Sequence, residues 1–388
     1  MLRMNLPSHT QVAIVGAGPV GTLLALQLHQ QGKQVLLLEA RAQNTVVGDQ
    51  RTLALSYLSL TALRDAGVSL PPSAFTAIHQ VHVSQQNHFG KTHIHQDDLN
   101  LPVLGAVIDY ASLIQACEAA LITQGVPVLW EASVDTVHSN DHYASLGFQH
   151  QGQAQLLTCD WLTLAEGGHL IQQLPALKRR EFNYEQTALV ATLTFAQAQN
   201  GIAFERFAEA GPFVLLPYQD NYRLVWTRSS ADAARLKTAS LIEFKTEFEA
   251  AFGQRLGPLL NVARPATFPL QLKQLNKVST GKVICIGNAA QTMHPVAAQG
   301  LNLGLRDALT LAAMMAPAGA LKNTQLGQQY GAKRRVDAHA VVGFTHSLVT
   351  LFEGHTPLMN HGRGLVMSAL DVIPAFRKRF SQHLVFGL

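Results

Sequence analysis

A glycine-rich hexapeptide near the start of the chain could bind the phosphates of a dinucleotide. It reads Gly16-Ala17-Gly18-Pro19-Val20-Gly21, follows a β-branched apolar run and precedes a leucine-rich stretch with helical spacing. In this pattern the first glycine permits a tight turn, the second lets the backbone approach a pyrophosphate, and the third lets the helix pack closely on the strand. The free N–H groups at the helix start would then face the phosphates. We expect Gly16, Gly18, Pro19, Val20 and Gly21 to bind a cofactor.

The acid at the end of the next strand indicates which nucleotide the turn would hold. Glu39 follows the apolar run Val35–Leu38, and a carboxylate at this point accepts hydrogen bonds from a ribose diol. Because a carboxylate disfavours a 2′-phosphate, the motif predicts tightly bound FAD or NAD and not NADP. The motif alone does not separate FAD from NAD, so an NAD-dependent dehydrogenase stays open at this point.

A second glycine-rich segment lies far along the chain. Residues 287–307 read GNAAQTMHPVAAQGLNLGLRD, and they follow an apolar run at 282–286 and open a stretch with helical spacing. Gly300 at the helix start would let backbone N–H groups approach an anionic atom. A reduced flavin carries negative charge near N1 and O2, so this helix end is a physical candidate for the isoalloxazine site.

This second segment resembles the motif GDAAHxxxPxxGQGxNxGxxD of class A flavoprotein monooxygenases in the ubiquinone-biosynthesis hydroxylase family (UbiH, UbiF, UbiI and VisC-like proteins). Asn288 stands for its Asp and Gln291 for its His, while His294 precedes Pro295. This variant is most similar to the UbiH branch, the 2-polyprenyl-6-methoxyphenol hydroxylases. The resemblance extends over nearly the whole chain, through residues 49–55, 184–188, 204–207, 211–212, 216–217 and 268–270.

The resemblance also implies the residues of the site. His294 and Pro295 are the candidate catalytic residues, with His294 nearest the flavin; a histidine that caps a turn is the rival interpretation. Arg51 is expected at the cofactor unless it forms a surface salt bridge. Glu166 stands where the family has the Asp of an Asp-Gly pair, which is linked to FAD and NAD(P)H handling. The other expected cofactor-binding residues are Gly287, Asn288, Gly300, Leu301 and Asn302.

By this resemblance the protein is expected to be an FAD-dependent, NAD(P)H-using monooxygenase that hydroxylates a polyprenylated phenol, 2-polyprenyl-6-methoxyphenol, in ubiquinone biosynthesis. NAD(P)H would reduce the flavin, and a C4a-hydroperoxyflavin formed with O₂ would deliver oxygen to the ring. Two alternatives stay open: a class A hydroxylase of a small soluble phenol, and a non-catalytic FAD-binding scaffold of a biosynthetic complex. The scaffold alternative stays open because Glu166 and Asn288 both depart from the family pattern.

The elements around these motifs predict an α/β fold. A strand at 12–15, a helix at 19–31 and a strand at 35–38 form a βαβ opening. The resemblance implies a Rossmann-type FAD-binding domain, like those of glutathione reductase and p-hydroxybenzoate hydroxylase, with an antiparallel-sheet substrate domain and C-terminal helices. The expected FAD-binding domain comprises residues 1–72, 101–179 and 281–335, the substrate domain 73–100 and 180–280, and the C-terminal helical region 336–388.

Further helices are expected over 110–124, 241–252, 299–315 and 324–352, with strands at 126–130, 134–138, 143–149, 155–159 and 161–165. Residues 180–228 are rich in strand formers and aromatic side chains, which predicts an open antiparallel sheet with one apolar face. These aromatic side chains would wall a pocket for a polyprenyl-phenol or, on the plainer interpretation, mostly pack in the core.

The composition limits the class of protein. Of the 388 residues 47 % are hydrophobic and only 14 % are charged, which argues for a large buried interior and against disorder. No basic stripe interleaved with aromatic residues indicates nucleic-acid binding. The three cysteines lie in apolar stretches and are expected to be buried thiols. His93 and His95 are interpreted as part of an ordinary exposed strand face and not as metal ligands, since no third ligand is near in the sequence.

The charge distribution and the chain's start bear on its location. The net charge of +4 includes basic triplets at 178–180, 333–335 and 377–379, which we interpret as solvated patches, with anionic lipid or a partner protein as the alternative. The start lacks the apolar region of a signal peptide, and no stretch is apolar enough to span a bilayer, so a cytoplasmic protein is expected. Residues 364–388 could contact the inner membrane or other ubiquinone-biosynthesis proteins; a packed terminal helix is the alternative.

Overall fold

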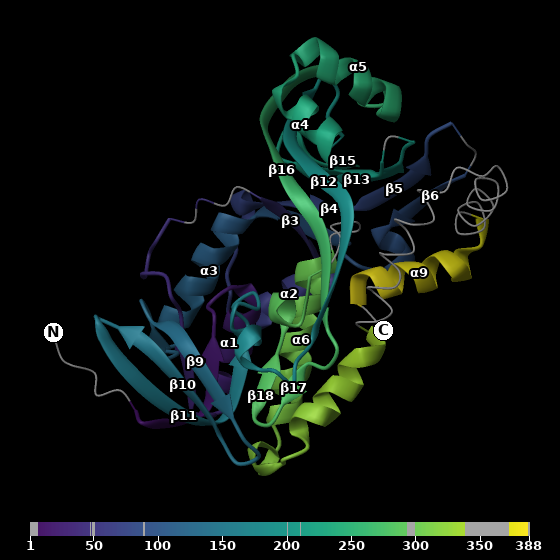
Figure 1. Ribbon diagram of the computed structural model, residues 1–388. Coiled ribbons are helices and arrows are strands. Elements are labelled where there is room, and N and C mark those ends of the chain that lie inside the picture. Colours follow the sequence, from purple (N-terminus) through teal and green to yellow (C-terminus); the bar gives the residue numbers. More distant parts are fainter. Residues whose placement is uncertain are drawn as a thin grey trace.

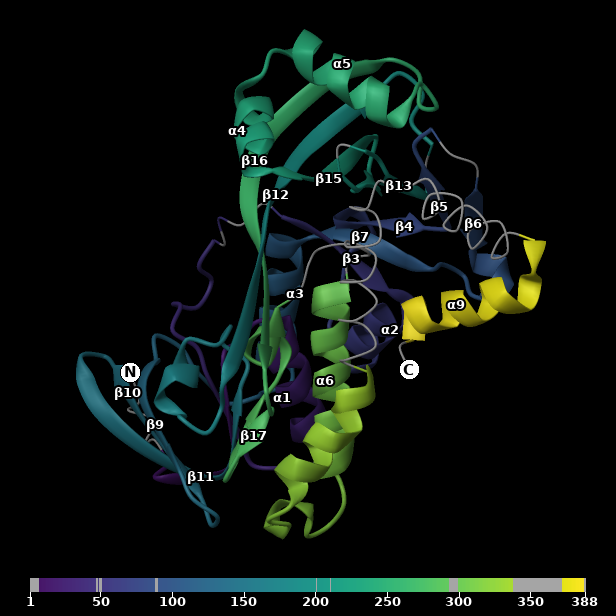
Figure 2. The same cartoon turned by 45° about the vertical axis from the view of Figure 1, so that its right-hand side comes forward.

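The computed structural model describes residues 7–46, 48, 51–87, 90–199, 201–209, 211–292, 299–337 and 372–386. These residues form three sheets with helices packed on them. Figures 1 and 2 show the first sheet, with β1 and β9 to β11, in the lower body, and the second, with β12 to β16, in the upper body. The expected α/β fold is confirmed.

The first sheet has a parallel centre, in the order β17-β18-β11-β1-β2-β8. Its strand β1 (His9–Val15) pairs in parallel with β2 (Val35–Leu38) and with β11 (Gln153–Leu164). Strands buried on both faces read as continuous apolar runs, which is why the sequence predicted them. The other strands of this sheet are β8 (Val128–Leu129), β9 (Ser133–Ser139), β10 (Ala144–His150), β17 (Ser279–Thr280) and β18 (Val283–Cys285).

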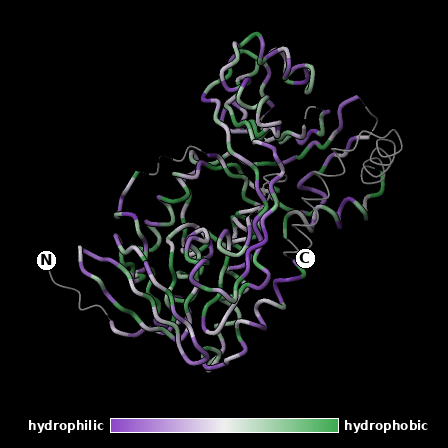
Figure 3. The backbone as a smooth tube through the Cα atoms, viewed as in Figure 1, coloured by the Kyte–Doolittle hydropathy of each residue, from purple (hydrophilic) through white to green (hydrophobic). Residues whose placement is uncertain are grey.

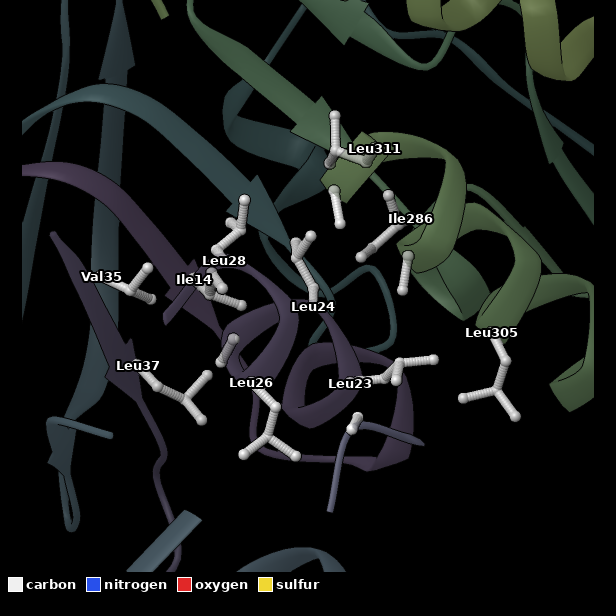
Figure 4. Close-up of a cluster of buried hydrophobic side chains, with 14 of the residues drawn as sticks. Ile14, Leu23, Leu24, Leu26, Leu28, Val35, Leu37, Ile286, Leu305 and Leu311 are labelled. Atoms are coloured by element: carbon white, nitrogen blue, oxygen red, sulfur yellow. The ribbon is translucent and has the colours of Figure 1, made fainter. Parts of the chain in front are cut away.

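Among the helices that share the core on one face of this sheet, three contribute most of the buried side chains. They are α1 (Pro19–Gln30), α3 (Tyr110–Thr123) and α6 (Gln299–Met315). Figure 4 shows the leucines of α1 between Ile14 of β1 and Leu305 of α6, all fully buried. Each such side chain stabilises the fold by about 1.5–3 kcal/mol. This packing fixes α1 against α6, so the glycine motifs at the N-terminal ends of both helices are brought to the same side of the sheet.

The second sheet is mostly antiparallel, in the order β19-β16-β12-β15-β14-β13-β5-β6. Phe213, Trp226 and other aromatic residues on one of its faces pack in a core with α5 (Leu241–Phe252) and α4 (Ser230–Thr238). The expectation that most of these aromatic residues are core is confirmed. The strands are β5 (Gln80–Gln85), β6 (Lys91–His95), β12 (Arg179–Phe195), β13 (Ile202–Phe207), β14 (Phe213–Tyr218), β15 (Asn221–Ser229), β16 (Leu259–Leu275) and β19 (Gln291–Thr292).

Strands β12 and β16 link the two bodies. Each has 17 residues, and they pair from Arg179 and Leu275 at the lower end to Phe195 and Leu259 at the upper end. Figure 3 shows their lower part as mostly hydrophilic. Strand β16 was not predicted, because few of its side chains are buried and its sequence lacks regular alternation.

A small third sheet, in the order β3-β7-β4, lies beside the second sheet. It consists of β3 (Thr52–Ser56), β4 (Phe75–Ile78) and β7 (Gly105–Asp109), and α2 (Tyr57–Asp65) follows β3. Apolar side chains of this sheet, of the second sheet and of the C-terminal helix α9 (Pro374–Phe386) form one buried cluster. Short 3₁₀ turns complete the described chain: η1 (Pro72–Ala74), η2 (Gln96–Leu99), η3 (Leu170–Gln173), η4 (Gly287–Ala289) and η6 (Ala320–Lys322).

Several expectations need correction. The strands expected at 155–159 and 161–165 are one strand, β11. Of the helix expected over 324–352, residues 326–337 are helical and the remainder lies outside the described residues. The basic triplets are not all solvated, because Arg334 is only 7 % exposed and Arg179 is half-buried.

The remaining surface and cysteine findings agree with the sequence. All three cysteines are buried and free, and burial raises the pKa of Cys117 and of Cys159 to about 12. His93 and His95 lie on strand β6, as expected, but both are half-buried and not on an exposed face. In the part of the chain that the structure describes, no helix has the length and apolar character needed to cross a bilayer.

Candidate functional site

The first glycine turn joins β1 to α1 and leaves a helix end open. Gly16 has a φ of +103°, and a Cβ there would lie 2.9 Å from the carbonyl oxygen of Ala165, so the turn requires glycine. A Cβ at Gly18 would meet no protein atom within 4 Å. Helix α1 begins at Pro19 without a side-chain cap. Its first backbone N–H groups are therefore available to an anionic ligand.

The predicted ribose-binding acid also holds this turn in place. The Oε2 atom of Glu39 accepts a hydrogen bond of 2.7 Å from the backbone N–H of Ala17, and its Oε1 atom accepts from the N–H and side chain of Arg41. Glu39 is only 8 % exposed. A carboxylate has about four acceptor positions, so these bonds leave room for a ribose hydroxyl.

The second glycine turn touches the first. A Cβ at Gly287 would lie 3.3 Å from a methyl group of Val20, and a Cβ at Gly304 would lie 2.9 Å from another methyl group of Val20. Val20 thus sits in the first turn and packs against both the second turn and α6. Gly21 has a packing role, since a Cβ there would lie 2.0 Å from the carbonyl oxygen of Gly16. Two motifs that lie far apart in the sequence form one surface.

Both turns line a single cavity of about 860 Å³. This volume lies in the range of cofactor and ligand sites. The cavity reaches from the first turn past the second turn to the second sheet, where its wall is aliphatic: Val214, Leu216 and Val225. Of the predicted cofactor-binding residues, those that line it are Gly16, Gly18, Pro19, Val20, Glu39, Arg51, Glu166, Gly287, Asn288, Gly300 and Leu301.

Two predicted site residues have clear structural partners. Glu166 accepts hydrogen bonds from the backbone N–H groups of Gly168 (3.0 Å) and His169 (2.7 Å), so it shapes the turn after β11 while lining the cavity. Asn302 is 2 % exposed; its Oδ1 atom accepts from the Ser59 hydroxyl at 2.7 Å, and its Nδ2 atom donates to the carbonyl oxygen of Ala54. Asn302 therefore ties α6 to the region of β3 and α2.

The remaining predicted residues are placed as follows. The guanidinium of Arg51 lies over the Tyr110 ring, 5.6 Å from its centroid, and both residues line the cavity. His294 and Pro295 lie outside the described residues. Among the residues that the structure does describe, no cluster of three His, Cys, Asp or Glu side chains could hold a metal ion.

A buried ion network behind the second turn was missed in the sequence. Asp307 accepts hydrogen bonds from the backbone N–H of Gly287 (3.0 Å), from Gln291 (3.1 Å) and from Arg334 (2.6 Å). Arg334 also contacts Asp337 at 2.6 Å. Although burial opposes the charged form, the Asp307 carboxylate raises the pKa of Arg334, so this side chain stays a cation. The network holds the Gly287 turn from inside the protein.

Some signal for this network was present in the sequence. Asp307 is the final Asp of the motif at 287–307, and Arg334 belongs to the basic triplet at 333–335. The spacing does not reveal that the two side chains meet. The aliphatic wall was missed for a different reason. Its residues belong to a segment in which the aromatic residues stood out, and most of those pack on the opposite face of the sheet.

Comparisons with known proteins agree with this geometry. A family model described as "FAD binding domain" matches residues 9–345. The chain is 34 % identical over 209 residues to the ubiquinone hydroxylase UbiL of Rhodospirillum rubrum, which covers 53 % of this chain and 49 % of that protein. It is 28 % identical over 311 residues to the 3-demethoxyubiquinol 3-hydroxylase of Escherichia coli, covering 77 % of each. The crystal structure of a p-nitrophenol 4-monooxygenase from Pseudomonas putida has the same fold, with a TM-score of 0.77, 16 % identity and 97 % coverage of both chains.

Proposed function

Because the chain belongs to the FAD-binding-domain family and is an FAD-dependent aromatic-ring monooxygenase, we propose that it hydroxylates the ring of a polyprenylated phenol in ubiquinone biosynthesis. The proposed substrate is 2-polyprenyl-6-methoxyphenol. The observation that carries the proposal is the aliphatic wall at one end of the cavity, formed by Val214, Leu216 and Val225. The UbiL protein and the E. coli protein, which are named as hydroxylases of ubiquinone and of 3-demethoxyubiquinol, support the same substrate class.

The two glycine turns would bind opposite parts of the cofactor. The open start of α1, with Gly16, Gly18 and Pro19, would bind the diphosphate, and Glu39 would accept from the ribose diol. Gly287, Asn288, Gly300 and Leu301 would lie along the flavin and its ribityl chain, with Arg51 nearby. These roles are assigned from position, since all of these residues line the same cavity.

The bound FAD supplies the electrons taken from NAD(P)H and the activation of O₂, of which one oxygen atom enters the ring and the other leaves as water. The protein's own contribution is to position the ring and to exclude water. Val214, Leu216 and Val225 offer no hydrogen-bonding side chains, so this end of the cavity favours an apolar substrate over water. The role of His294 and Pro295 beside the ring stays a prediction.

The C-terminal helix supports a contact with the inner membrane, where a polyprenyl tail is soluble. Helix α9 and the two residues before it expose Val372, Ile373 and Phe376, and Lys378 and Arg379 are exposed beside them. Apolar side chains flanked by cations are typical of helices that bind anionic lipid surfaces. We propose that α9 makes a peripheral contact with the anionic lipid surface of the inner membrane.

Quinone profiling of a deletion strain tests the proposal. The strain should lose ubiquinone and accumulate a monomethoxy prenylphenol, and the wild-type gene should restore the normal profile. A variant with Gly18→Val, which blocks the cofactor site, is the matched control and should not restore it. Unchanged ubiquinone in the deletion strain would contradict the proposed substrate and would favour a hydroxylase of a small soluble phenol.

A second assay addresses the scaffold alternative. The purified, FAD-loaded protein should oxidise NAD(P)H faster when a prenylated phenol is added, and it should release the hydroxylated product. Bound FAD without any phenol-stimulated oxidation would favour the non-catalytic scaffold.

A further inference from the structure

Strand β13 places a carboxylate on the cavity-facing side of the second sheet. Glu205 lies directly opposite Val214 of β14, and residues opposite each other in an antiparallel pair have side chains on the same face. Val214 lines the cavity. The flanking residue Phe204 points to the other face, where it packs in the aromatic core. Glu205 is therefore the next side chain along the sheet from the aliphatic wall.

Its surroundings are apolar and leave one oxygen atom without a partner. On its other side Glu205 pairs with Val83 of β5, and the buried cluster on this face includes Val81, Val83, Ala203 and Val214. The Oε1 atom of Glu205 is buried and has no hydrogen-bond partner among the described residues. Burial raises the pKa of Glu205 from an ordinary 4.5 to about 7. A buried acceptor without a donor is costly, so such a group points to a ligand that supplies the donor.

The charged groups that the structure describes near this face, other than Glu205, pair with one another. The Tyr218 hydroxyl donates to Asp109, and burial, followed by this bond, raises the pKa of Tyr218 to about 12. Arg223 lies over the Tyr218 ring and forms an ion pair with Asp109 at 3.6 Å. On the elements packed against the face, Arg377 of α9 pairs with Asp98 at 3.0 Å. Among the described acids of this face, Glu205 thus has an oxygen atom, Oε1, that is left for a substrate.

We propose that Glu205 is the catalytic acid–base residue that accepts the hydroxyl proton of the phenolic substrate. The inference rests on the proposed function, since it requires a phenol bound between the flavin and the second sheet. The proton of the ring hydroxyl moves to the Glu205 carboxylate as the oxygen's electron pair enters the ring. The ring carbon then forms its new C–O bond with one oxygen atom of O₂ that has been reduced by the two electrons from NAD(P)H. The O–O bond breaks in this step, and the other oxygen atom leaves as water.

The same carboxyl group completes the step. The attacked carbon then carries both hydrogen and the new hydroxyl, and the ring oxygen is a carbonyl. Loss of that C–H proton to solvent restores the aromatic ring, and Glu205 returns its proton to the ring oxygen. A group that titrates near neutral pH suits both halves of this exchange.

A pair of probes tests the binding part without turnover. The probes are 2-(3-methylbut-2-enyl)phenol and its methyl ether, titrated by calorimetry into the FAD-loaded protein without NAD(P)H. At pH 8 the wild type should bind the phenol about ten- to a hundredfold more tightly than the ether, because only the phenol donates to the carboxylate. The preference should shrink below pH 6, as Glu205 takes up a proton. In Glu205→Gln it should be small and independent of pH.

Turnover of the phenol probe tests the catalytic part. Glu205→Gln should keep its FAD and lose roughly a hundredfold or more in kcat at pH 7, with activity recovering toward pH 10, where phenols ionise in water. Glu205→Asp should retain part of the rate and the pH dependence near neutrality. The exposed Glu209→Gln is the matched control and should behave as the wild type.

Two results would overturn the assignment: equal affinity of the wild type for the two probes at pH 8, or a preference and a pH profile that Glu205→Gln leaves unchanged. The comparison of the two probes uses the wild-type protein alone. The inference can therefore be refuted even if Glu205→Gln fails to fold. Failure of the proposed function is separate. Unchanged ubiquinone in the deletion strain would contradict the physiological substrate, while the probe preference and its loss in Glu205→Gln would still establish Glu205 as the phenol's proton acceptor.

Discussion

Removal of the Arg334 cation should loosen the second glycine turn from inside the protein. Arg334→Met leaves the Asp307 carboxylate, which is 2 % exposed, without the guanidinium that contacts it at 2.6 Å. Breaking a buried ion pair in this way costs about 3–5 kcal/mol, because the remaining charge stays uncompensated. Asp337 loses less, since it keeps its ion pair with Arg306 at 3.1 Å. Because Asp307 also accepts from the backbone N–H of Gly287, we expect weaker FAD binding as well.

Urea unfolding followed by circular dichroism measures the first effect, and titration of the apoprotein with FAD measures the second. The double variant Arg334→Met/Asp307→Asn removes both charges and should recover most of the lost stability, since the asparagine oxygen still accepts from Gly287. The adjacent Arg335→Met is the control; its side chain is exposed, and its cost should stay below about 0.5 kcal/mol. The reasoning is refuted if Arg334→Met costs no more than Arg335→Met, or if the double variant is less stable than the single one.

Three further predictions concern the cavity and its walls. Gly18→Val should fold normally, because a Cβ there would meet no protein atom within 4 Å. Its side chain would enter the cofactor site, so the FAD affinity should fall at least about tenfold, and the protein's yellow absorbance will report this loss. Gly16→Val should instead fail to fold stably, because the backbone at Gly16 is left-handed and a Cβ there would be crowded. Leu216→Trp should raise the KM for a prenylated phenol while FAD content is unchanged, whereas Leu215→Ala, on the opposite face, should cost about 2–5 kcal/mol in unfolding experiments and leave KM unaltered. Burial raises the pKa of Glu205 in the folded state, so the folded protein binds this proton more tightly than the unfolded chain does. The urea midpoint of the wild type should therefore fall relative to that of Glu205→Gln as the pH rises from about 4.5 to about 7. If the two midpoints change with pH in the same way over this range, the carboxyl group of Glu205 is not buried as described.

The elements that the sequence predicted best are those with one strong local pattern, such as an apolar run or a glycine-rich turn. The strand at 12–15 and the helix after it were predicted because a fully buried strand must be apolar and the glycine turn has few alternatives. The contact between Val20 and Gly287 was not predicted, and the close packing of α1 and α6 accounts for it physically.

The parts that escaped prediction depend on partners far away in the chain. Arg334 looks like a surface residue in its triplet, and only the folded position of Asp307 makes it a buried cation. Val214 and Glu205 are ordinary strand residues until the register of β13 and β14 places them together on the cavity side. Strand β16 is held by pairing with β12 and not by its own burial pattern, so its sequence carried little information.

The parallel contact between β5 and β13 has a consequence for synthesis on the ribosome. Strand β5 ends at Gln85, but its parallel partner β13 begins only at Ile202. The β5–β6 hairpin therefore leaves the ribosome with the backbone groups of one strand edge unpaired. The first sheet is also completed late in synthesis, because β11 cannot pair with β18 until the ribosome has added Cys285. A nascent chain therefore carries open strand edges for most of its length, and such edges invite association with other chains. We expect this protein to depend on chaperones during translation more than a protein whose strands pair with their immediate neighbours.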